Sequence, residues 1–67
     1  MDKDQAVQIK EKALAAVESL ISVLATMEGR VSPDEFERIK RSVGLAVGAI
    51  EMHINVPLYQ MFPDLET

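Results

Sequence analysis

Hydrophobic residues recur every three or four positions along the first part of the chain, which is the spacing that places them on one face of an α-helix. From about residue 4 to residue 28 they form two neighbouring stripes. The first consists of Ala6, Ile9, Ala13, Ala16, Leu20, Val23 and Met27. The second consists of Val7, Leu14, Val17, Ile21 and Leu24. Together the stripes make a face too wide for one partner helix to cover. The pattern predicts a helix over residues 4–28 that contacts more than one neighbour.

A turn and a second helix are predicted after this first one. Gly29 suits the left-handed conformation that ends many helices. The segment Ser32-Pro33-Asp34-Glu35 then combines a capping serine, a proline at the first helical position and a glutamate three residues after the cap. So short a connection leaves too little chain for a crossover, so the two helices are predicted to form an antiparallel hairpin.

The second helix, from residue 33, is predicted to end at about Asn55, because Pro57 disfavours helical geometry at the preceding residue and has no N–H to donate. Its hydrophobic stripe consists of Phe36, Ile39, Val43, Ala46, Ile50 and His53. Residues 56–67 form a short apolar tail that makes a single helical turn or lies extended. The tail is either a lid over the open end of the hairpin or a partner-binding segment anchored by Leu58, Tyr59, Met61 and Phe62.

Residues 43–50 form an uninterrupted run without a polar side chain inside the second helix. Gly44 and Gly48 share one helix face there, and each loses roughly 1 kcal/mol relative to alanine in a helix interior. A close backbone approach, either within the hairpin or between subunits, is expected to compensate. We expect it between subunits, because the first helix covers only one face of this run. The predicted dimer interface comprises Gly44, Leu45, Val47, Gly48, Ile50 and Met52.

Length and composition support self-association. A chain of 67 residues has room for one domain and buries only about 60% of its unfolded surface. It contains no cysteine, so disulfides and thiolate metal sites cannot stabilise it. Oligomerisation remains as the means of stabilising so small a core. The predicted fold of residues 1–67 is therefore all-α, with a single antiparallel helical hairpin that dimerises into a four-helix bundle and carries a C-terminal apolar tail.

Charge offers one candidate site for a different function. The bases Arg30, Arg38, Lys40 and Arg41 cluster near the predicted turn and could hold a phosphate or a nucleic-acid backbone. Acidic residues alternate with them, and the net charge of the chain is −4, which argues against general nucleic-acid binding. A solvated face is the expected interpretation, and a nucleic-acid-binding regulator is the alternative.

Catalytic and metal-binding patterns are missing from the sequence. His53 is the one histidine, and Glu51, two positions away, falls on a different helix face, so neither a metal nor another cofactor is expected. There is no glycine-rich phosphate loop and no helical HExxH pair, so an enzyme is not expected.

The start of the chain lacks signal-peptide features, and the longest uncharged stretches are too short to cross a bilayer. These features predict a cytoplasmic protein that does not associate with a membrane. The expected function is a non-enzymatic homodimer that acts as a structural or protein-interaction module.

Overall fold

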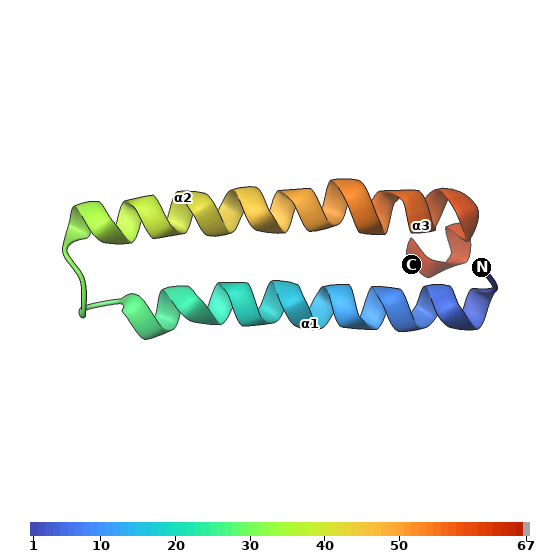
Figure 1. The fold of residues 1–67 in the computed structure, drawn as a ribbon, viewed down its shortest axis with the longest axis horizontal. Coiled ribbons are helices and arrows are strands. Elements are labelled where there is room, and N and C mark those ends of the chain that lie inside the picture. The colour runs from blue at the N-terminus through green and yellow to red at the C-terminus, as the bar shows by residue number, and fades with distance from the viewer. Residues whose placement is uncertain (67) are drawn as a thin grey trace.

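The computed structural model describes residues 1–66, which form two long helical segments lying side by side and running in opposite directions (Figure 1). Helix α1 spans Lys3–Met27 and helix α2 spans Pro33–Ile50. A π-helical turn, η1 (Glu51–Asn55), joins α2 to α3 (Val56–Met61), and a 3₁₀ turn, η2 (Pro63–Glu66), follows. The predicted all-helical fold is confirmed for this part of the chain. Thr67, the last residue of the predicted tail, lies outside the described residues.

Both long helices begin with reciprocal capping hydrogen bonds. The Ser32 hydroxyl accepts from the Glu35 N–H at 3.2 Å, and the Glu35 carboxylate accepts from the Ser32 N–H at 3.0 Å. Asp2 and Gln5 make the same pair of bonds at the start of α1. Gly29 has φ +75° in the connection between the helices. The predicted cap at Ser32 and the left-handed Gly29 are therefore confirmed.

The prediction that the second helix ends at about Asn55 is wrong, because the helical segment continues past Pro57 to Met61. In a regular α-helix the proline ring would clash with the carbonyl of the residue four positions earlier and would remove one hydrogen bond. The π turn accommodates the chain instead, and the Val56 N–H donates to the Glu51 carbonyl five residues back. Pro57 then lies in the first turn of α3, where a missing N–H is tolerated.

The π turn changes which residues face α1. Val43 is buried and Ile50 is half-buried, as helical spacing requires. The next buried position is Asn55, five residues further on, followed by Leu58. His53, which the hydrophobic stripe placed on this face, is exposed. The π turn accounts for the exposure of His53 as well, because it contains one residue more than an α-helical turn.

The most extensive burial lies at the end of the hairpin that holds the termini. Ala6, Leu58 and Leu65 are buried together, and Val7, Ile9, Tyr59 and Phe62 pack against them. Elsewhere in the described chain only Ala13 and Val43 are buried hydrophobic residues, and no large side chain is completely buried. One copy of the chain therefore has a thin core.

Candidate interaction surfaces

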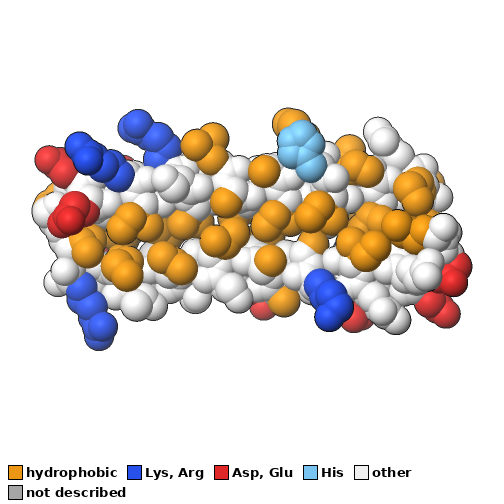
Figure 2. Space-filling model, in the orientation of Figure 1, with side chains coloured by type: hydrophobic (Ala, Val, Ile, Leu, Met, Phe, Trp, Pro, Cys, Tyr) orange, Lys and Arg blue, Asp and Glu red, His pale blue; other side chains and the backbone are white. Residues whose placement is uncertain are grey.

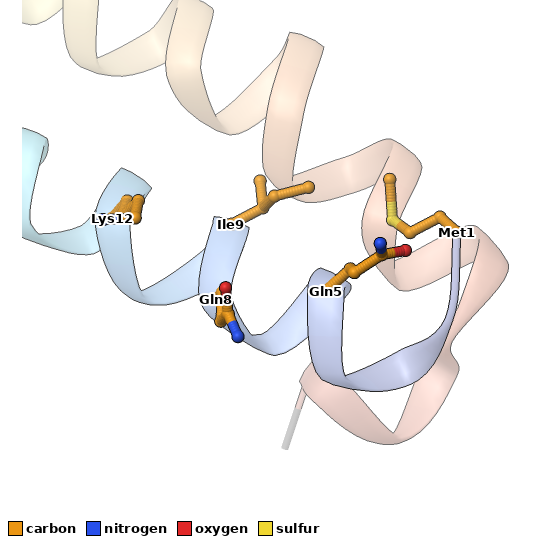
Figure 3. A pocket seen from close by; sticks show the side chains of 5 residues that line it. All are labelled: Met1, Gln5, Gln8, Ile9 and Lys12. Carbon is orange, nitrogen blue, oxygen red and sulfur yellow. The ribbon is translucent and has the colours of Figure 1, made fainter.

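A hydrophobic groove follows the seam between the helices in the half of the hairpin nearest the termini. One section has a volume of about 280 Å³ and is lined by Ile9, Lys12, Ala13, Ala16, Ile50 and Ile54. A second section of about 340 Å³ is lined by Met1, Gln5, Gln8, Ile9 and Lys12, with Ile9 and Met1 pointing toward the second helical segment and Gln8 away from it (Figure 3). Ile9 and Lys12 line both sections, so the two sections of the groove adjoin along α1.

Hydrophobic side chains extend along most of the seam. On the face drawn in Figure 2 they form a band between the two helical segments that runs from one end of the molecule to the other. Charged side chains lie mainly beyond the edges and at the ends of this band. A surface of this kind, apolar in the middle and polar at its border, is typical of protein–protein contact sites.

Two ridges of large side chains lie outside the groove. The α1 ridge consists of Leu14 and Ile21, each 54% exposed and two helical turns apart on one face. Leu14 follows the buried Ala13 by about 100° around the helix, on the side opposite Ala16 and the groove. The α2 ridge consists of Leu45 on α2 and Met52 in the adjoining η1, which are 71% and 66% exposed. Leu45 is about 200° around the helix from the buried Val43, so this ridge points away from α1.

The predicted interface residues do not share one surface. Ile50 lines the groove and Val47 is half-buried, whereas Leu45 and Met52 form the α2 ridge. A Cβ atom added at Gly44 or Gly48 would meet no atom within 4 Å. A close backbone approach inside the hairpin, one of the two interpretations of these glycines, is therefore absent. Both glycines lie open to contact from outside the chain.

The apolar tail lies against the first turns of α1. Leu58 is 4% exposed within the core cluster, and Tyr59 and Phe62 are half-buried beside it. Of the four residues predicted to anchor a partner-binding segment, Met61 alone is strongly exposed, at 53%. The tail therefore occupies the position expected of a lid.

Two lysines of α1 hold the tail in place. The Lys10 ammonium donates to the Leu65 carbonyl and lies 5.6 Å from the centre of the Tyr59 ring, within the range of a cation–π contact. Lys3 forms an ion pair with Asp64, and this hydrogen bond lowers the pKa of the Asp64 carboxyl. Both side chains of the pair are more than half exposed, so its contribution is screened by water and salt.

Asn55 is a buried polar residue that the sequence did not mark, because it was predicted to be the last residue of the helix. Its side-chain N–H₂ donates to the Glu51 carboxylate at 2.9 Å, and its Oδ1 has no hydrogen-bond donor among the described residues. The π turn carries Asn55 into this position. The signal that would have located Asn55 is a change of hydrophobic spacing after Ile50. Leu58 and Phe62 take the core-facing positions that regular spacing gives to His53 and Met61.

The basic cluster is only partly assembled. Arg38 and Arg41 are three positions apart and share a face of α2, but Lys40 is about 200° around the helix from Arg38. Arg30 belongs to the turn, and all four side chains are exposed. None of them forms an ion pair within residues 1–66. The Glu35 carboxylate is engaged by the backbone N–H and hydroxyl of Ser32, which lower its pKa.

Other kinds of site have no counterpart in the described chain. Within residues 1–66 no group of three or more histidine and acidic side chains is arranged to hold a metal ion. No helix in this region combines the length and hydrophobicity needed to cross a membrane. No protein-family model, curated protein or solved structure matches the chain significantly.

Proposed function

We propose that this protein is a non-enzymatic homodimer, assembled as a four-helix bundle, that acts as a structural or protein-interaction module in the cytoplasm. The observation that carries the proposal is the amount of hydrophobic surface that one copy leaves uncovered. Large hydrophobic side chains exposed by more than half include Leu14, Ile21, Leu45, Met52 and Met61. Single exposed apolar residues are ordinary on protein surfaces, but ridges and a continuous band are not.

The surface area of one copy also supports a dimer. The accessible surface is 5043 Å², whereas a compact monomer of 7.4 kDa is expected to expose about 4,200 Å². The excess, roughly 800 Å², is close to what each partner contributes to a standard protein–protein interface. Its origin is the elongated shape, with extents of 45 × 18 × 16 Å. A second hairpin laid on the first would produce a more compact body with a core between two layers.

Sedimentation velocity over a range of protein concentrations, with far-UV circular dichroism at the same concentrations, tests this proposal. We expect a dimer at micromolar concentration, with a melting temperature that falls on dilution because folding and association are coupled. A folded monomer at micromolar concentration, with a melting temperature independent of dilution, would show that the exposed apolar surface does not drive self-association.

A second candidate, binding of nucleic acid, rests on the exposed pair Arg38 and Arg41, which form no ion pair with an acid of the described chain. Dimer symmetry would double this pair. Such binding should weaken steeply as salt is raised and should be lost when both residues are replaced by glutamate. Fluorescence anisotropy with short RNA and DNA at low salt decides the matter, since no binding by the unmodified protein excludes this candidate.

A further inference from the structure

The groove combines protruding and recessed positions. Ala13 and Ala16 each contribute only a methyl group, whereas Ile9, Ile50 and Ile54 contribute large side chains. In a two-fold symmetric interface the same patch meets itself, so one surface must supply both the knobs and the holes. The groove satisfies this requirement within one protomer.

We infer that the groove is the surface through which a second copy of this chain docks, groove against groove, with isoleucines of each protomer entering beside alanines of the other. This inference rests on the proposed homodimer and specifies its interface. Helices in such bundles lie about 8–10 Å apart, and small residues at the contact favour the closer end of that range. The two hairpins then form the two layers of the bundle.

The groove involves both helical segments of a protomer, whereas either ridge involves one. Each ridge consists of two side chains on one helical segment, so a contact centred there starts from that segment alone. One section of the groove is lined by both helical segments, and the adjoining section follows α1 toward the start of the chain along Met1, Gln5 and Gln8. A contact centred on the groove can therefore spread along the hydrophobic band between the two helical segments (Figure 2).

The groove carries little charge. Lys12 is the one charged side chain among the residues that line its two sections. A long lysine side chain can bury its methylene groups while its ammonium stays in water at the rim. Few charges would therefore lose hydration when a second copy docks there.

Two adjacent alanines of α1 provide a matched test. Both are exposed in one copy, but Ala16 lines the groove, whereas Ala15 lies about 100° around the helix and lines neither section. Sedimentation of Ala16→Glu should show a dimer dissociation constant raised by at least about 100-fold, because an unpaired carboxylate would be buried in the interface. Ala15→Glu should stay within about threefold of the unmodified protein, since it adds a charge to a solvated face.

A second measurement keeps the inference testable if Ala16→Glu fails to fold. The protein has no cysteine, so Ala16→Cys and Ala15→Cys each introduce a single thiol with little change in volume. At dimer-forming concentration, alkylation of the Ala16→Cys thiol should be at least about tenfold slower than that of Ala15→Cys, because access controls thiol reactivity. The difference should shrink when the protein is diluted below the dissociation constant.

The possible failures are distinguishable. A dimer that survives Ala16→Glu, leaves Ala16→Cys reactive, and is lost in Leu45→Glu or Leu14→Glu would place the interface on a ridge. That result would overturn this inference and leave the proposed homodimer standing. An unmodified chain that sediments as a folded monomer would overturn both.

Discussion

Truncation of Leu58 to alanine tests whether the tail is an integral part of the fold. Leu58 is 4% exposed and packs in one cluster with Ala6 and Leu65. Replacing a buried leucine by alanine costs about 2–5 kcal/mol, depending on how far the surroundings close over the cavity. This cluster is small and lies at one end of the molecule, where neighbouring side chains can move in. We therefore expect a loss of about 2–3 kcal/mol, near the lower end of that range.

A loss of this size would be a large part of the total stability. A chain of 67 residues is expected to have a free energy of unfolding of roughly 3–10 kcal/mol. In a domain of this length each kilocalorie per mole shifts the melting temperature by about 4–8 °C. The Leu58→Ala protein should therefore melt about 10–20 °C below the unmodified protein.

Met61→Ala is the matched control, because Met61 belongs to the same helix, α3, but is 53% exposed. We expect it to change the free energy of unfolding by less than about 1 kcal/mol. Urea unfolding followed by far-UV circular dichroism measures both variants, at one protein concentration because association contributes to stability. Equal losses in the two variants, or no loss in Leu58→Ala, would refute the assignment of the tail to the core.

Three further predictions concern the helices and the tail. Gly48→Ala should raise the free energy of unfolding by about 0.5–1 kcal/mol in thermal melts, because alanine favours helix and no atom lies within 4 Å of the added Cβ; a loss would reveal a contact on that face. Ser32→Ala should cost about 1 kcal/mol. It should raise the pKa of Glu35 only part of the way toward its ordinary value, as measured by NMR titration, because the hydroxyl is lost while the backbone N–H, the larger cause of the lowered pKa, remains. Asp64 has a lowered pKa, so its ion pair with Lys3 stabilises the fold above the ordinary carboxyl pKa of 3.8 and ceases to do so as the pH falls through the lowered value. The difference in melting temperature between the unmodified protein and Asp64→Asn should disappear at that acidic pH and shrink in high salt; a constant difference would contradict this assignment.

The parts of the fold that depend on local chemistry could be predicted from the sequence. The hydrophobic repeat along α1 and the cap at Ser32 each specify a helix through nearby residues alone, and α1 lies within one residue of the predicted bounds at each end. Gly29 likewise marks the turn through its own backbone preference. Such signals need no knowledge of the rest of the chain.

The features that depend on tertiary contacts could not be predicted in this way. Pro57 was interpreted as a stop, which holds for a regular α-helix but not where a π turn absorbs the missing hydrogen bond. The side on which Leu45 and Met52 lie depends on where α1 contacts α2, and the hydrophobic run from Val43 to Ile50 does not specify that line. For the same reason the predicted interface combined residues from the groove and from the α2 ridge.

The π turn links the groove to the tail. Regular helical spacing after Ile50 would direct Ile54, Pro57 and Met61 toward α1, yet Ile54 and Met61 are 38% and 53% exposed. With the additional residue in η1, Ile54 lines the groove and Leu58 enters the core. The same shift buries Asn55 with its Oδ1 lacking a donor, at a cost of about 1–3 kcal/mol. Burial of Leu58, at about 2–3 kcal/mol, is of the size needed to offset that cost. A single local irregularity therefore determines both which side chains line the groove and how the tail covers the end of α1.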